Sequence, residues 1–232
     1  CAMAFNRIVD RKFDAKNPRT ANRHLPAGAI SLPSALTLCV LSAAGLIAAS
    51  YFLNPLCFWL SPVALAVICF YSLTKRFTDY THVFLGIALA LAPVGAWLAV
   101  KGADVSGLEI AQMIVLCAAV IFWLIGFDII YATLDEEFDR SHGIHSMVAW
   151  LGRANALRVS WLLHLVAAFA LAQVALGAML HAPQSMAWAG VAIALYCGTL
   201  VLLWLEQRWA EDVNLAFFQI NVWVGAAVLA IV

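Results

Sequence analysis

The sequence predicts an all-α membrane protein, built as a multi-helix transmembrane bundle. Of its 232 residues, 65% are hydrophobic and only 11% are charged, which is more apolar than a soluble domain of this length needs to fill one core. Apolar stretches long enough to cross about 30 Å of hydrocarbon recur along the whole chain. The short polar breaks between them contain turn-forming residues. These observations together predict a series of helices that cross a lipid bilayer.

Seven complete spans of about 20 residues each are expected. They are residues 31–53, 55–74, 82–100, 108–127, 157–180, 186–205 and 213–232. Asn54-Pro55 separates the first two spans, and a break at residues 101–104 separates the third from the fourth. Pro33, Pro62 and Pro93 fall within spans, which packed membrane helices tolerate.

The charged residues gather in two polar segments. Residues 7–23 hold eight of the 26 charged side chains, and residues 128–140 hold six more. Successive loops between spans lie on opposite sides of the membrane. When they are assigned in this way, twelve of the 13 Lys and Arg residues fall on one side of the membrane, and only Lys101 falls on the other. Because positive residues are retained on the cytoplasmic side, both polar segments are predicted to face the cytoplasm.

The first polar segment carries a regular series of oxygen-bearing side chains. Asn6, Asp10 and Asp14 recur at every fourth residue. On a helix these side chains fall within about 80° of one another. One helix face is therefore predicted to carry an amide and two carboxylates.

The second polar segment has a similar series. Its members are Asp128, Tyr131, Asp135 and Asp139. On one continuous helix these four share a face, whereas the two glutamates after Asp135 point away from it. The motifs are offset by 125 residues, from Asp10 to Asp135, and each leads into three further spans. This predicts a pseudo-repeat of two helical units with facing acidic helices.

The two acidic faces predict a magnesium–diphosphate site. Aligned carboxylates repel one another unless a cation lies between them, and ionisable groups at a membrane helix end are costly unless they are paired or functional. Oxygen ligands with positions left open to water and phosphate suit Mg²⁺ better than a protein-only Ca²⁺ cage. Cations suited to phosphate oxygens lie at Arg19, Arg23, Lys75 and Arg76. Neither the histidines nor the six cysteines show a zinc spacing.

Other classes of protein fit the pattern less well. Surface salt bridges would explain one acidic motif, but not two at matched positions. A CDP-alcohol phosphotransferase would need a DGxxAR string, which the sequence lacks. A cation-coupled transporter would need acids near the middle of its spans, and it remains the alternative function.

The motifs resemble those of the UbiA superfamily of intramembrane aromatic prenyltransferases. Residues 6–14 are similar to its first NxxxDxxxD motif, and residues 128–146 to its second. Residues 19–28 are similar to the loop that follows the first motif in 4-hydroxybenzoate polyprenyltransferases, and residues 71–78 to a segment between the motifs. The resemblance covers essentially the whole chain, so residues 1–232 are expected to form one domain of this type.

The resemblance also implies nine helices around a central cavity. This sequence has seven complete spans, and residues 1–5 read as the end of a further apolar helix. We therefore expect a chain that lacks the N-terminal start of the nine-helix family pattern.

The resemblance further implies roles for individual residues. The expected catalytic residues are Asp10, Asp14, Asp128, Tyr131, Asp135 and Asp139. The expected substrate-binding residues are Asn6, Arg19, Arg23, Tyr71, Lys75 and Arg76. The expected Mg²⁺ ligands are Asn6, Asp10, Asp14, Asp135 and Asp139. Tyr71 and Tyr131 would offer π faces to an allylic carbocation.

The implied function is transfer of a polyprenyl group from polyprenyl diphosphate to an aromatic acceptor. We expect the acceptor to be 4-hydroxybenzoate or a related aromatic acid, in ubiquinone or menaquinone biosynthesis, with Mg²⁺ as cofactor. Residues 134–146 also resemble a bacterial branch linked to menaquinone through futalosine. The expected location is the bacterial inner membrane, with the site facing the cytoplasm and no nucleic-acid partner. The acceptor, the tail length and the oligomeric state stay open.

Overall fold

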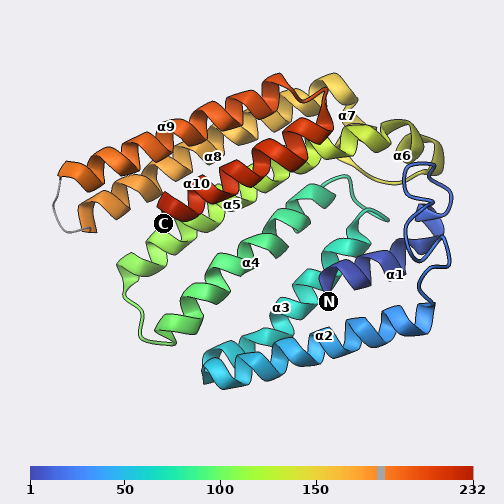
Figure 1. Cartoon of the computed structure of the whole chain (residues 1–232), viewed down its shortest axis with the longest axis horizontal. Coiled ribbons are helices and arrows are strands. Elements are labelled where there is room, and N and C mark those ends of the chain that lie inside the picture. The colour runs from blue at the N-terminus through green and yellow to red at the C-terminus, as the bar shows by residue number, and fades with distance from the viewer. Residues whose placement is uncertain (182–185, 232) are drawn as a thin grey trace. The chain divides into compact units, whose positions relative to one another are not determined.

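The computed structural model describes residues 1–181 and 186–231, and the regular elements in these ranges are helices (Figure 1). The chain divides into two compact units, Cys1–Asp104 and Val105–Val232. Unit 1 contains α1 (Ala2–Asp14), α2 (Leu32–Leu53), α3 (Pro55–Thr74) and α4 (Thr81–Lys101). Unit 2 contains α5 (Gly107–Ala132), the 3₁₀ turn η1 (Thr133–Asp135), α6 (Glu136–His142), α7 (Met147–Leu151), α8 (Arg153–His181), α9 (Met186–Arg208), the π-helix η2 (Asn214–Ile220) and α10 (Asn221–Ile231).

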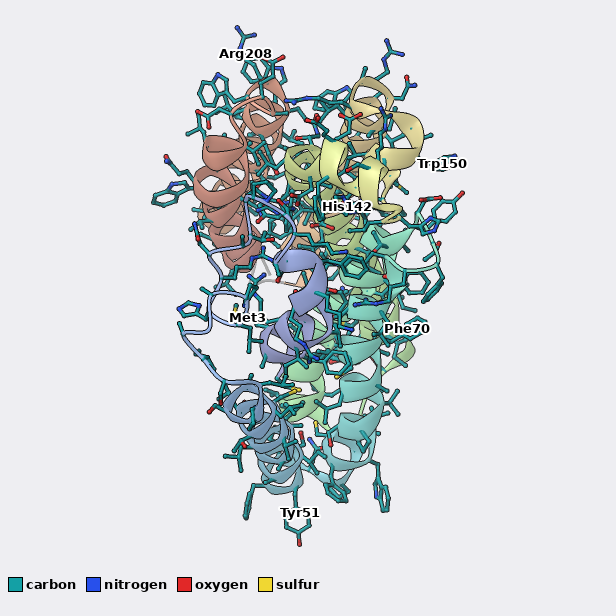
Figure 2. The ribbon with its side chains drawn as sticks, turned by 90° about the vertical axis from the view of Figure 1, so that its right-hand side faces the viewer. Met3, Tyr51, Phe70, His142, Trp150 and Arg208 are labelled. Carbon is teal, nitrogen blue, oxygen red and sulfur yellow. The ribbon has the colours of Figure 1, made fainter. Side chains whose placement is uncertain are left out.

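The helices confirm the predicted all-α membrane fold. Six of them are long and apolar enough to cross a membrane, which indicates an integral membrane protein. The seventh expected span, residues 213–232, instead begins as the π-helix η2 and continues as the short apolar helix α10. Many large apolar side chains on the long helices are exposed, as lipid-facing side chains are. Figure 2 shows one of them, Tyr51, pointing outward at the end of α2.

Local sequence signals explain where the helices begin and end. Asn54 caps α3, because its Oδ1 accepts a hydrogen bond from the Cys57 amide at 2.9 Å, and Pro55 occupies the first turn, where no amide is needed. Ser106 and Glu109 form a reciprocal capping box at the start of α5. Gly143 ends α6 with a φ of +64°, in the left-handed region that glycine adopts at low cost.

In unit 1, α3 and α4 form a hairpin that is tied at both ends. Asn54 Nδ2 donates to the Leu98 carbonyl at 2.9 Å, and the Thr74 and Thr81 hydroxyl oxygens lie 2.8 Å apart. Pro62 lies inside α3 and cannot donate to the carbonyl of Phe58. The Ser61 hydroxyl donates to that carbonyl at 2.8 Å instead, which explains how a span with an internal proline keeps its backbone satisfied.

Unit 2 packs around the long α5–α8 pair, which makes its most extensive helix contact. One apolar cluster gathers residues of α5, α8, α9, η2 and α10, including Leu171, Leu203 and Val224. A second cluster joins Ile130 of α5 to Ala210, Val213 and Ala216. Unit 1 therefore starts with a helix that carries the first acidic motif, and unit 2 starts with a helix whose end carries the first residues of the second motif. Further apolar helices follow in each unit.

Candidate functional site

The first acidic motif lies on α1, and its two aspartates are the buried residues of that helix. Asp10 is 1% exposed and Asp14 is 5% exposed. Asn6 shares their face, because its Nδ2 donates to Asp10 Oδ2 at 3.1 Å. The spacing of four residues, close to one helical turn, produces this alignment. Two carboxylates this deeply buried need compensation by positive charge.

Asp10 receives that compensation from the end of α3. Lys75 Nζ lies 2.5 Å from Asp10 Oδ2, and Arg76 Nη2 lies 3.0 Å from Asp10 Oδ1. Both carboxylate oxygens therefore face a cation. The predicted grouping of Asn6, Asp10, Lys75 and Arg76 is thus present as one cluster within unit 1.

Arg76 also holds α1 against α3 through uncharged partners. Its Nη1 donates to the Ser72 carbonyl at 2.8 Å, and its Nη2 donates to the Val9 carbonyl at 2.9 Å. Its guanidinium carbon lies 5.6 Å from the centre of the Phe13 ring, a cation–π distance. The flat, multi-donor guanidinium makes these contacts together, which a lysine ammonium could not do.

Asp14 is compensated by the loop that follows α1. Arg23 Nη1 donates to Asp14 Oδ1 at 2.7 Å, and the Thr20 hydroxyl donates to the Asp14 carbonyl at 3.1 Å, so the loop folds back onto the helix end. Arg7 Nη1 lies 3.9 Å from Asp14 Oδ2, a contact that the sequence interpretation missed. Arg19 is exposed in the same loop, and its backbone amide donates to Asn17 Oδ1 at 3.0 Å.

An apolar cavity of about 440 Å³ lies within unit 1. Side chains of α2, α3 and α4 line it, and it reaches Ala2 of α1 and Tyr71 of α3. Tyr71 precedes Lys75 by one helical turn. The apolar wall of the cavity and the charged cluster around Asp10 therefore follow each other along α3 and its end. Unit 1 therefore combines a charged end with an adjoining apolar surface.

The second motif lies in unit 2, on a helix that changes its winding. Asp128 and Tyr131 are on α5, Asp135 ends the 3₁₀ turn η1, and Asp139 is on α6. The sequence predicts one continuous helix face. Because a 3₁₀ turn winds by about 120° per residue instead of 100°, the three residues of η1 rotate the later aspartates by about 60° relative to Asp128.

The glutamates beside the motif face a different surface. Glu136 pairs with Arg140 at 3.3 Å, and both line an open hollow of about 600 Å³ together with Glu137 and Arg153. Asp135 and Asp139 are not among the residues that line it. Glu136 and Glu137 thus point away from the motif aspartates, as their spacing predicts.

One carboxylate oxygen in the first motif is suited to bind a metal ion. Among the described residues, no three His, Cys, Asp or Glu side chains gather as a ready metal site. Along a helix, residues seven apart are separated by about 10 Å, so Asp128 cannot join Asp135 on one ion. Asp14 Oδ2 is buried and accepts no hydrogen bond among the described residues. A buried carboxylate oxygen without a donor fits a hard cation such as Mg²⁺.

Sequence reasoning missed a buried polar group in unit 2. His164 is fully buried, with Nδ1 3.0 Å from Gln207 Nε2. Glu206, next to Gln207, is also fully buried. The presence of His164 inside the expected span 157–180 is the signal that could have found this group, because an ionisable residue within a membrane span is costly.

Comparison with known proteins gives a consistent result. A family model described as the UbiA prenyltransferase family matches residues 1–224. A 4-hydroxybenzoate octaprenyltransferase of Azoarcus sp. is 35% identical over 234 residues, covering 97% of this chain and 75% of that protein. The apo structure of a UbiA homolog from Aeropyrum pernix K1 aligns with a TM-score of 0.83 at 33% identity, covering 99% of this chain and 83% of that one.

Other relatives match over a shorter part. A 4-hydroxybenzoate solanesyltransferase of Synechocystis sp. is 36% identical over 151 residues, which are 64% of this chain and 49% of that protein. A polyprenyl transferase of Arthrinium sp. is matched over 47% of its length. The chain thus spans about half the length of these two relatives. The match over residues 1–224 and the 35% identity across nearly the whole chain show that the chain belongs to the UbiA prenyltransferase family.

Proposed function

We propose that the protein transfers a polyprenyl group from polyprenyl diphosphate to an aromatic acid, 4-hydroxybenzoate or a related compound, for ubiquinone or menaquinone synthesis. The observation that carries this proposal is the cluster of buried carboxylates and cations at the end of α1, inside a unit of apolar helices. Such a cluster suits a substrate that has a diphosphate head and a hydrocarbon tail. Family membership supports the same activity, and residues 1–232 are proposed to act as one domain of this type.

The cations of unit 1 would bind the diphosphate. Lys75 and Arg76 lie together at the end of α3, and Arg23 lies in the loop over Asp14. Their positive charges would stabilise negative charge that develops on the diphosphate as its bond to the allylic carbon breaks. Arg19, exposed in the same loop, would add to the cover of the site.

The carboxylates and Asn6 would hold the metal. When bound, Mg²⁺ would neutralise the leaving diphosphate. Asp10 and Asp14, with Asn6, would hold it on α1, and Asp135 and Asp139 would hold it on the second motif. Of the carboxylate oxygens on α1, Asp14 Oδ2 is the most available for this role, since it accepts no hydrogen bond from described residues.

The aromatic faces would protect the reactive carbon. Tyr71 and Tyr131 would stabilise the allylic cation through their π electrons, while the apolar helices exclude water that would otherwise capture it. Asp128 would line the site beside Tyr131. The electron-rich ring of the acceptor then forms a bond to the allylic carbon and loses a proton. We place the protein in a bacterial inner membrane, with the site toward the cytoplasm, because the cations concentrate on that side.

The test is an assay of the protein in membranes with labelled polyprenyl diphosphate and a panel of aromatic acids, with and without Mg²⁺. We expect metal-dependent transfer to at least one acid. Asp10→Ala and Asp135→Ala should each abolish transfer while the protein still inserts and folds. Transfer that is absent for every acceptor, or that persists without divalent metal, would contradict the proposal.

A further inference from the structure

Three buried residues and the half-buried Gln207 form a polar network in unit 2, on the side of α5 away from the second acidic motif. The Ser160 hydroxyl donates to the Gly126 carbonyl at 2.7 Å. Gln207 Nε2 lies 2.5 Å from Ser160 Oγ and 3.0 Å from His164 Nδ1, and an amide nitrogen has two hydrogens to donate. We call Gly126, Ser160, His164 and Gln207 the buried clamp. It joins α5, α8 and α9.

The clamp contains a close approach that only glycine permits. A Cβ atom added at Gly126 would lie 2.3 Å from both Cδ2 and Nε2 of His164. Such a distance is far below van der Waals contact, so the imidazole packs directly on the backbone of α5. Any side chain at residue 126 must displace the His164 ring, push α8 away or rotate α5.

The clamp lies between two apolar clusters. On α5 it falls between Ala119 of one cluster and Ile130 of the other. Near the end of α9, Gln207 falls between Leu203 on that helix and Ala210 in the turn that follows it, which belong to the same two clusters. Apolar contacts alone permit a helix to rotate or slide by a fraction of a turn, whereas buried hydrogen bonds are satisfied in one register only. The clamp therefore selects one rotation and one height of α5.

Gly126 of the clamp and the first residues of the second acidic motif lie on the same helix, α5, so the clamp also fixes where those residues point. On α5, Asp128 follows Gly126 by about 200° of rotation and Tyr131 follows it by about 140°, so both project from the opposite face. A rotation of α5 that relieved a clash at residue 126 would swing both side chains by the same angle. The 3₁₀ turn that carries Asp135 continues directly from this end of α5.

We propose that Gly126, Ser160, His164 and Gln207 are positioning residues, which set the rotation and height of the α5 end that carries Asp128 and Tyr131. They act through the helix and touch neither substrate nor metal. The effect on catalysis rests on the proposed prenyl transfer, but the effect on helix position does not. The two are therefore tested by separate measurements.

The first measurement reports helix position without activity. Spin labels are placed at Glu137→Cys on α6 and Asn155→Cys on α8, both exposed in unit 2, after the native cysteines are replaced. Gly126→Ala should shift or broaden the distance distribution. Gly126→Ala combined with His164→Ala removes the clashing ring and should restore it. Gly198→Ala on α9 is the matched control, because a Cβ there meets nothing within 4 Å.

The second measurement is the kinetics of transfer in the same variants. Gly126→Ala should lower kcat by about tenfold or more, since misplacement of a reacting group by about 1 Å can cost a factor of about 100. The KM for the aromatic acid should change little. The double variant should recover most of the kcat, because deleting the imidazole removes the clash. Ser160→Ala, which adds no atoms, should give a smaller loss in the same direction.

The outcomes separate the two hypotheses. Distances that respond as expected in a protein that transfers no prenyl group would support the clamp and contradict the proposed function. Transfer with unchanged distances and unchanged kcat in Gly126→Ala would contradict the clamp alone. A double variant as impaired as Gly126→Ala in both measurements would also overturn it.

Discussion

The two aspartates of α1 should differ in how much they stabilise the protein before metal or substrate binds. Asp10 bridges two cations of α3, at 2.5 and 3.0 Å, and accepts a hydrogen bond from Asn6. Asp14 has one close cation, Arg23 at 2.7 Å, while its second oxygen lies 3.9 Å from Arg7 and accepts no hydrogen bond among the described residues. We predict that Asp10→Asn is the more destabilising of two substitutions that preserve side-chain volume.

The magnitude follows from the burial of the partners. Removing one member of a fully buried ion pair costs about 3–5 kcal/mol. Lys75 and Arg76 keep 28% and 30% of their side-chain exposure, so water recovers part of that loss. We therefore expect about 1–3 kcal/mol for Asp10→Asn, from the general cost of orphaned charges. For Asp14→Asn, with one charge-assisted bond lost, we expect about 1 kcal/mol.

The assay is thermal unfolding in detergent without divalent metal, followed by tryptophan fluorescence. For a chain of this size, 1 kcal/mol corresponds to about 2–4 °C in Tm, so Asp10→Asn should lower Tm by about 2–12 °C and Asp14→Asn by about 2–4 °C, with the larger shift for Asp10→Asn. In a double-mutant cycle, Lys75→Met should cost less in the Asp10→Asn background than alone. Equal shifts, the reverse order, or strict additivity with Lys75→Met would refute this reasoning.

Three further predictions concern single side chains. Asn54→Ala removes the cap of α3 and the bond to the Leu98 carbonyl, and should cost about 1–2 kcal/mol in thermal unfolding, whereas an unchanged Tm would contradict the role of this contact. Glu136→Ala breaks only a half-exposed pair with Arg140, so we expect a change within about 0.5 kcal/mol and transfer activity within about twofold, and a large loss would place Glu136 in the site. Glu206→Leu replaces a fully buried carboxyl whose oxygens accept no hydrogen bond from described residues, and should raise the unfolding temperature. A lower unfolding temperature would contradict this and show that the carboxyl has a partner in the folded protein.

Much of the fold was predictable because its signals are local. The apolar stretches are long enough to specify their own helices, and the caps at Asn54 and Ser106 follow from residues three positions apart. The common face of Asn6 and Asp10 follows from helical periodicity alone. The roles of the motif residues as metal and diphosphate ligands stay predictions.

The structure differs from the predicted helices at two places, where tertiary packing outweighs the local sequence pattern. The second motif reads as one helix in the sequence, yet Thr133–Asp135 wind as a 3₁₀ turn. The last span reads as a plain apolar helix, yet its first part is a π-helix. Apolar periodicity is nearly the same for these windings over a few residues, so composition cannot distinguish them.

The sequence by itself determined that this protein is a bundle of apolar helices with two acidic motifs and a set of nearby cations. The tertiary structure alone decided which cation neutralises which carboxylate: Arg76 and Asp10 are 66 residues apart in the chain. It also decided that His164 lies against Gly126 and joins a network through three helices. Helix formation depends on neighbours within one or two turns, whereas ion pairs and close helix contacts depend on how distant segments pack, which local spacing does not encode.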